Sequence, residues 1–281
     1  MGIIDGKMVA SQIKANITTE VQSLKMKTGK TPGLAVVLVG DDPASAVYVR
    51  NKNKTCNNIG FQSFENILPA NTSESELLHL IHELNIDEKI HGILVQLPLP
   101  NHISSNKILE AINPQKDVDG FHLENVGRLV TGNSLFKPCT PAGIIKLLDK
   151  YDVEIEGKNA VIIGRSNIVG KPVAFLLLER NATVTICHSR TKNLSNLAAS
   201  ADILIAAIGK PNFVTADMVK DNSVVIDVGI NRLAGKLVGD VDFSSIVKKV
   251  SLITPVPGGV GPMTIAMLME NTFRAFKNSL Y

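Results

Sequence analysis

The chain has 281 residues, 44% hydrophobic and 20% charged, and its scattered basic residues give a net charge of only +3, which argues against a nucleic-acid-binding protein. The start of the chain does not resemble a signal peptide or a myristoylation site, and the apolar runs are too short to span a membrane. Three cysteines without a metal-binding spacing fit free thiols, so we expect a cytoplasmic protein with no membrane partner.

Short unbroken apolar runs alternate with helix-length amphipathic segments along the chain. The runs lie at 33–40, 92–97, 160–164, 182–187, 202–209 and 223–230. Unbroken runs are typical of parallel strands that are buried on both faces, and their alternation with helices is the βαβ pattern. The sequence therefore predicts an α/β fold with parallel sheets.

A turn-rich stretch from Pro114 to Pro141 interrupts this alternation. It has no long apolar run, and a helix-like segment, AGIIKLLDKYD, leads from its end into the later strands. We therefore predict two α/β domains. Residues 1–139 form the first, and residues 140–262 form the second, which is Rossmann-like. A last helix follows within 263–281.

The first candidate site lies in the segment GDDPASAVYVRNKNKTCNNIG. Pro43 fits the first turn of a helix, and Asp41 or Asp42 fits its N-cap. One face of this helix carries Tyr48, Lys52, Cys56 and Ile59. Lys52 thus falls inside an apolar stripe. Either it extends along its own stem to water, or it is a partly desolvated amine whose lowered pKa suits proton transfer.

Polar residues near two later segments are candidates to join this lysine. Gln96 lies late in the apolar run GILVQL, where a buried amide needs a hydrogen-bond partner such as Lys52 or the following loop. Asp117 and Asp119 stand two residues apart in KDVDGF, so an extended backbone turns only one of them toward a cleft. The alternative for both aspartates is turn capping.

The segment AVIIGRSNIVGKPVA has the pattern of strand, tight loop and helix. Gly164 permits the tight turn, Gly170 permits close helix packing, and Ser166 replaces the second glycine of the usual dinucleotide fingerprint. A helix N-terminus directly after a buried strand binds anions, because its first amides are unpaired and its dipole end is positive. The alternative is an ordinary strand-to-helix turn.

The end of the next strand indicates which dinucleotide would bind. NAD-binding proteins tend to carry an acid there, whereas VTIC is followed by His188, Ser189 and Arg190. Together with Arg165, these residues offer a site for the extra phosphate of NADP. Strands that end in AAIG and DVGIN, the latter containing Ile230, add to the same ligand-binding edge.

A Pro/Gly loop, TPVPGGVGPMT, precedes the last helix. Its glycines would let the backbone lie flat against a ring-shaped ligand, and Pro262 fits the first helical turn; the alternative is a linker. The histidines indicate no metal site. His79 and His82 lack the zincin spacing and are expected to be exposed on a helix.

Taken together, these motifs resemble the bifunctional methylenetetrahydrofolate dehydrogenase/methenyltetrahydrofolate cyclohydrolase family. In chain order they are YVRNKNKTCNNIG, GILVQLPLP, KDVDGF, PCTPAG, IIGRSNIVGKPVA, DVGIN and TPVPGGVGPMT. The resemblance covers nearly the full chain. It implies NADP-dependent oxidation of 5,10-methylenetetrahydrofolate and hydrolysis of the product to 10-formyltetrahydrofolate, in one-carbon metabolism and purine biosynthesis.

The resemblance also implies roles for individual residues. Lys52 matches the proton-transfer residue of the cyclohydrolase, Gln96 the residue that positions it, Tyr48 the tyrosine that stacks along the folate, and Asp119 the aspartate that binds the pterin. Further substrate-binding residues are expected at Val95, Leu97, Pro257, Gly258 and Gly259. NADP-binding residues are expected at Gly164, Arg165, Ser166, Ser189, Arg190 and Ile230.

The quaternary structure of the family is a further expectation. The resemblance implies a homodimer in which each chain has two α/β domains around a cleft and the last helix returns to the first domain. Three other functions stay open: a dehydrogenase of another small substrate such as a hydroxy acid, a family member with one of the two activities, and a non-catalytic NADP-binding regulator. The regulator would leave Lys52 and Gln96 without a task.

Overall fold

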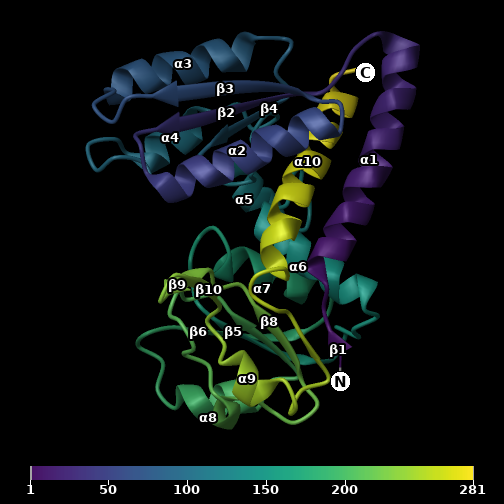
Figure 1. The fold of residues 1–281 in the computed structure, drawn as a ribbon, viewed down its shortest axis with the longest axis vertical. Helices are drawn as coiled ribbons and strands as arrows, with labels where there is room; N and C mark the ends of the chain where they lie inside the picture. Colours follow the sequence, from purple (N-terminus) through teal and green to yellow (C-terminus); the bar gives the residue numbers. More distant parts are fainter. Residues whose placement is uncertain (1, 281) are drawn as a thin grey trace. The chain divides into compact units, whose positions relative to one another are not determined.

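The computed structural model describes residues 2–280, which form two compact units, each with its own parallel sheet. The three-stranded unit takes Gln12–Lys137 and the chain from Leu268 onward, and the six-stranded unit takes the chain up to Ser11 and Pro138–Met267. The α/β fold with parallel sheets is confirmed (Figure 1). The domain limits 1–139, 140–262 and 263–281 stay predictions, and their end residues 1 and 281 lie outside the described chain.

The three-stranded unit has the strand order β3-β2-β4, with every strand parallel to its neighbour. Its strands are β2 (Gly33–Val39), β3 (Gln62–Leu68) and β4 (Gly92–Val95). Its helices are α2 (Pro43–Asn58), α3 (Glu74–Ile86), α4 (Ser105–Ala111) and α5 (Leu123–Val130), with parts of α1 (Gly6–Thr28) and α10 (Val260–Asn278). Figure 1 shows α2 and α3 on opposite faces of the sheet.

The six-stranded unit has the order β1-β11-β8-β7-β5-β6 in the described chain, again parallel throughout. Its strands are β5 (Asn159–Ile163), β6 (Thr183–Cys187), β7 (Ile203–Ala206), β8 (Val224–Asp227), β1 (Gly2–Ile3) and β11 (Leu252–Ile253). Its other elements are α6 (Cys139–Lys150), α7 (Gly170–Glu179), α8 (Leu194–Ala199), η1 (Ala216–Met218), α9 (Phe243–Ile246) and the hairpin β9 (Asn231–Leu233) and β10 (Lys236–Val238).

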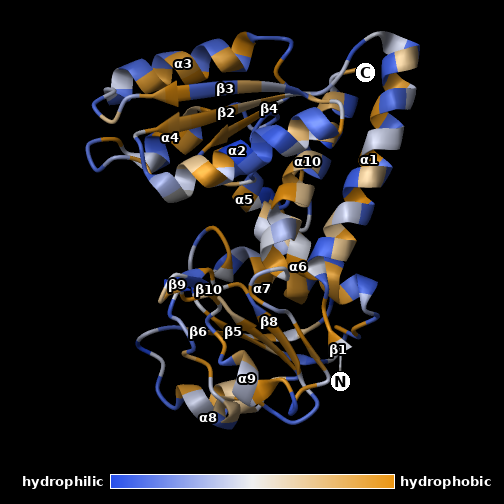
Figure 2. Ribbon diagram, viewed as in Figure 1, coloured by the Kyte–Doolittle hydropathy of each residue, from blue (hydrophilic) through white to orange (hydrophobic). Residues whose placement is uncertain are grey.

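Each apolar run that predicted a strand contains one, and most of these strands are covered on both faces, whereas β6 lies at a sheet edge and is largely exposed or half-buried. All residues of β2, β4, β7 and β8 are buried, and Figure 2 shows the central strands as predominantly hydrophobic. Strand β3 escaped prediction because it lies at a sheet edge and alternates exposed and partly buried residues. The turn-rich stretch contains the helix α5, which was not predicted from the sequence.

The last helix begins at Val260, earlier than predicted, and Pro262 lies in its first turn as expected. Within residues 2–280, no helix combines the length and the apolar character that crossing a membrane requires. All three cysteines are free thiols with buried side chains.

Candidate functional site

Helix α2 begins as its sequence predicts and thereby fixes where Lys52 lies. Pro43 occupies the first turn, and Asp42 is the N-cap, its carboxylate accepting a hydrogen bond from Ser45 N at 2.7 Å. The stripe is formed largely as expected, since Cys56 and Ile59 are buried and Tyr48 is 38% exposed at its outer end. Because the start of α2 is fixed, the helical periodicity places Lys52 on the same face as Tyr48, Cys56 and Ile59.

Lys52 is buried against a neutral hydrogen-bond acceptor. Its side chain is 8% exposed, and its Nζ donates to Gln96 Oε1 at 3.0 Å. Gln96 Nε2 in turn donates to Leu97 O at 2.7 Å, which orients the amide so that its oxygen faces the amine. An amide accepts this bond whether the amine is charged or neutral, whereas a carboxylate would favour the charged form. The structure therefore brings Lys52 and Gln96 together, and Lys52 does not extend to water.

Cys56, one turn further along α2, is not a second reactive group of this stripe. Burial raises the pKa of its thiol to about 12, and its Sγ lies 3.6 Å from Met269 Sδ. A thiol with that pKa is protonated at neutral pH and therefore a poor nucleophile. Val95, beside Gln96 on β4, is also buried, while Leu97 is half-buried.

The two aspartates of KDVDGF lie in different environments. Asp117 is 1% exposed and accepts hydrogen bonds from Phe121 N, His122 N and Asn125 Nδ2 at 3.2, 2.9 and 2.8 Å. Burial raises the pKa of this carboxyl, although these bonds oppose the shift. Asp119 is half-buried. Asp117 thus caps the turn, which was the alternative given for both residues, and Asp119 is the one with access to solvent.

The segment between these aspartates is also held from α10. Asn271 is 4% exposed, and its Nδ2 donates to Val118 O at 2.8 Å and to Lys137 O at 3.0 Å. The backbone that carries Asp119 is therefore fixed by the Asp117 turn on one side and by a buried amide on the other. The remaining predicted substrate residues, Pro257–Gly259, lie in the six-stranded unit.

The predicted dinucleotide loop follows the carboxyl end of β5. Gly164 has φ +131°, and a Cβ there would clash with Ala207 O, so only glycine fits this turn. Ser166 Oγ accepts hydrogen bonds from Val169 N and Gly170 N at 3.1 and 3.2 Å, which leaves its own O–H to donate to a ligand. The loop therefore offers a hydroxyl donor in the exposed segment 165–168 that precedes α7.

The other predicted cofactor residues follow neighbouring strands of the same sheet. Ser189 and Arg190 come directly after β6, which pairs in parallel with β5, and both are exposed, as is Arg165. Ile230 follows β8 and is 48% exposed. The chain passes from β6 across β5 to β7, so the strand order reverses between β5 and β7, where open α/β sheets bind ligands.

Two buried carboxylates at this edge were missed from the sequence. Asp227 ends β8, Asp240 follows β10, and they are 3% and 0% exposed. Asp240 accepts hydrogen bonds from three backbone amides of the loop after β7, and Asp227 accepts them from one amide after β8 and two after β10. The sequence signal was limited to an acidic residue inside or beside an apolar run. A carboxylate buried there needs hydrogen-bond donors around it.

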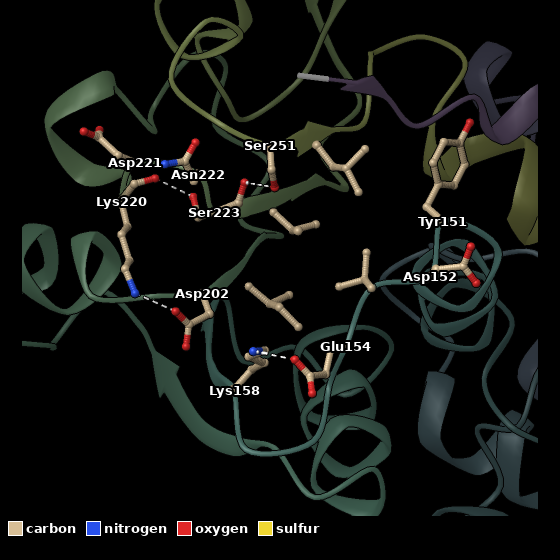
Figure 3. Close-up of a pocket in the computed structure, with 14 residues that line it drawn as sticks. Tyr151, Asp152, Glu154, Lys158, Asp202, Lys220, Asp221, Asn222, Ser223 and Ser251 are labelled. Atoms are coloured by element: carbon tan, nitrogen blue, oxygen red, sulfur yellow. Dashed lines mark hydrogen bonds and ion pairs between the residues drawn. The ribbon is translucent and has the colours of Figure 1, made fainter.

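The six-stranded unit also has a hollow of about 470 Å³ at its opposite edge, where the strands begin (Figure 3). Four of its charged side chains form two ion pairs, Lys158 with Glu154 at 2.7 Å and Lys220 with Asp202 at 2.6 Å, and Asp152 and Asp221 also line it. None of the predicted site residues lines it. We therefore do not place the candidate site in this hollow.

Comparisons with known proteins match nearly the whole chain to one family. Residues 4–119 match the catalytic-domain model of tetrahydrofolate dehydrogenase/cyclohydrolase, and residues 138–280 match the NAD(P)-binding-domain model of the same family. The curated Bifunctional protein FolD of Campylobacter hominis is 59% identical over 281 residues, which is 100% of this chain and 99% of that relative.

Solved structures agree over the same length. The bifunctional FolD enzyme of Campylobacter jejuni is 54% identical, with a TM-score of 0.97 and 99% of each chain covered. The methylenetetrahydrofolate dehydrogenase-cyclohydrolase of Trypanosoma brucei, complexed with NADP and an inhibitor, is 41% identical, with a TM-score of 0.95 and coverage of 99% of this chain and 98% of that one.

Proposed function

The chain belongs to the tetrahydrofolate dehydrogenase/cyclohydrolase family, and we propose that it catalyses both reactions of that family. The first is the oxidation of 5,10-methylenetetrahydrofolate to 5,10-methenyltetrahydrofolate with NADP. The second is the hydrolysis of that product to 10-formyltetrahydrofolate. The observation that carries the proposal is the match of both family models and of a bifunctional relative over the full chain.

The two reactions ask different things of the protein. Bound NADP would supply the hydride acceptor for the methylene carbon. The lone pair of the neighbouring substrate nitrogen would stabilise the cation that forms, so oxidation requires the protein to orient the substrate but needs no protein base. Hydrolysis requires water to lose a proton as it attacks the methenyl carbon, and a ring nitrogen to gain one as the ring opens. We assign this proton transfer to Lys52, with Gln96 holding its amine in place.

The residues that would hold the remaining parts of the ligands have fitting chemistry. Tyr48 offers an accessible ring to stack on the folate, and Asp119 an accessible acceptor for the pterin N–H groups. Ser166, Arg165 and Arg190 offer donors to the phosphates of NADP, and Gly164 permits the tight turn that precedes Arg165 and Ser166. Val95, Leu97, Pro257, Gly258, Gly259, Ser189 and Ile230 complete the proposed contacts.

A coupled assay tests the proposal against the alternatives. Purified protein is mixed with 5,10-methylenetetrahydrofolate and either NADP or NAD, and reduced nicotinamide and methenyltetrahydrofolate are followed by absorbance. We expect reduction of NADP and conversion of added methenyltetrahydrofolate to the formyl product. If only one of the two reactions is observed, the protein is a monofunctional member of the family. If neither is observed, it is a regulator or a dehydrogenase of another substrate.

The two aspartates are expected to differ when each is replaced by asparagine. Asp119→Asn should lower both activities by about 10-fold or more, because a charge-assisted bond to the pterin is lost. Asp117→Asn should instead cost about 1–3 kcal/mol of folding free energy, because an amide NH₂ would face backbone N–H donors that the carboxylate now satisfies. Activities per folded molecule and the Tm should be measured side by side. A larger activity loss in Asp117→Asn at unchanged Tm would reverse the assignment.

The proposed homodimer has a suitable surface in the six-stranded unit. Strand β6 ends the sheet order in the described chain, and Ile186 on it is 38% exposed, so an edge and an apolar side chain are available to a second copy. We expect sedimentation to give the mass of two chains and Ile186→Lys to shift it toward one. Leu233→Lys, on the hairpin, is the matched control. A single-chain mass for the unmodified protein would contradict the dimer.

We propose that the protein acts in the cytoplasm. Three buried free thiols fit the reducing cytoplasm, and the formyl product is suited to supply purine biosynthesis in one-carbon metabolism. Cell fractionation with an antibody to the chain would test the cytoplasmic location.

A further inference from the structure

Asp240 gathers the amides of one loop in the six-stranded unit. It is 0% exposed, and its Oδ2 accepts hydrogen bonds from Ile208 N at 2.7 Å and Gly209 N at 3.0 Å. Its Oδ1 accepts from Lys210 N at 2.8 Å and from Asn231 Nδ2 at 2.9 Å. The Asp240 side chain therefore accepts hydrogen bonds from three consecutive backbone N–H groups of the loop that follows β7, and from the side-chain amide of Asn231 on β9.

Asp227 holds Asp240 in the same manner. Its Oδ1 accepts from Gly229 N and Asp240 N, both at 2.9 Å, and its Oδ2 accepts from Val241 N at 3.0 Å. Burial raises the pKa of Asp227 to about 6, and the nearby Asp240 adds to that shift. The end of β8 thus fixes the backbone of Asp240, and Asp240 fixes the loop after β7.

The space around these carboxylates is reserved by glycine. A Cβ on Gly229 would clash with the carboxylate and backbone of Asp240, and a Cβ on Gly239 would clash with the carboxylate of Asp227. Both positions must therefore be glycine for the carboxylates of Asp227 and Asp240 to fit where they are buried. Each of the four carboxylate oxygens accepts at least one hydrogen bond, as buried polar atoms in folded proteins usually do.

The loop that Asp240 holds lies against the predicted dinucleotide turn. A Cβ on Gly164 would clash with Ala207 O, so the start of this loop is in direct contact with the glycine turn after β5. The contact lies between β5 and β7, where the strand order reverses. The position of Ile208–Lys210 is therefore tied, through Ala207, to the Gly164 turn at this edge of the sheet.

We propose that Asp240 is a positioning residue for the cofactor: it holds the loop 208–210 in place beside the Gly164 turn, and Asp227 holds Asp240. This rests on the proposed NADP site at that edge. Asp240 is fully buried and so acts through the loop. The hydrolysis of methenyltetrahydrofolate needs no NADP, so this inference predicts a loss confined to cofactor binding and the dehydrogenase.

Asp240→Asn is the direct test, with Asp242→Asn as its matched control. The variant keeps the size of the side chain but turns an NH₂ group toward backbone N–H donors, so the loop loses acceptors. We expect the Kd for NADP, measured by calorimetry, to rise by about 10-fold or more, with the dehydrogenase KM for NADP rising in parallel. Cyclohydrolase activity on added methenyltetrahydrofolate should stay within about twofold.

The control removes the same charge two residues away. Asp242 caps α9 by accepting from Ser245 N at 3.4 Å and from Ser244 Oγ at 2.8 Å, and Asp242→Asn should leave the Kd for NADP unchanged. If Asp240→Asn does not fold, Asn231→Ala removes one donor to Asp240, and a smaller rise in the same Kd supports the inference.

The possible outcomes separate this inference from the proposed function. An unchanged Kd in Asp240→Asn, or in Asn231→Ala where that variant replaces it, overturns the inference while the unmodified protein still reduces NADP. An equal fall of both activities also overturns it, because that is the signature of a general structural residue. An unmodified protein that neither binds nor reduces NADP instead overturns the proposed function.

Discussion

Lys52→Met is expected to lower cyclohydrolase activity by about 10²–10⁴-fold while dehydrogenase activity stays measurable, because general acid–base help typically contributes that factor. Hydride transfer needs no proton from the protein. Hydrolysis, in contrast, requires a proton to leave the attacking water and a proton to reach the ring nitrogen. Methionine keeps the length and the apolar stem of the side chain, so the buried stripe of α2 should stay packed. The variant should therefore release methenyltetrahydrofolate, which its absorbance reveals.

Lys54→Met is the matched control for this variant. Lys54 lies on the same helix, but its side chain is exposed, so the same substitution removes an equal charge away from Gln96. Both activities should be unchanged in the control. If Lys52→Met loses both activities in parallel at an unchanged Tm, Lys52 binds substrate and does not transfer the proton. If it loses neither, the buried contact with Gln96 is purely structural.

The fold could be predicted where burial alone decides the pattern. Strands β2 and β8 are covered on both faces, so their unbroken apolar runs predicted both their type and their place. Strand β3 could not be found in this way, because an edge strand needs few apolar residues and its alternation depends on which face is covered. The short strands β1 and β11 pair with each other across most of the chain, which no local pattern encodes.

The candidate site could be predicted only in part for a similar reason. Helical spacing alone placed Lys52 within an apolar stripe, and local chemistry limited the N-cap to Asp41 or Asp42, of which the structure shows Asp42. The hydrogen bond to Gln96 joins residues 44 positions apart, so its formation depends on how α2 packs on the sheet. Asp240 was missed because its partners are backbone amides of a distant loop, which leave no mark in the sequence.

Arg190→Ala is expected to lower kcat/KM for NADP by about 10- to 100-fold and to leave kcat/KM for NAD nearly unchanged, because only NADP has the extra phosphate that a charge-assisted bond would hold. Arg190 follows β6 without an acid nearby in sequence, and its backbone N donates to His188 Nδ1 at 3.1 Å, which fixes the turn that presents it. The unmodified protein should accordingly prefer NADP.

Two controls separate a specific phosphate contact from general charge. Arg180→Ala removes the same charge from the end of α7, where Arg180 pairs with Asp149 at 2.8 Å, and it should alter neither value. Raising the salt concentration should reduce the preference of the unmodified protein for NADP more than that of Arg190→Ala, since screening weakens an exposed ion pair. Equal kcat/KM values for NADP and NAD in the unmodified protein would show that the basic strand end does not select the cofactor.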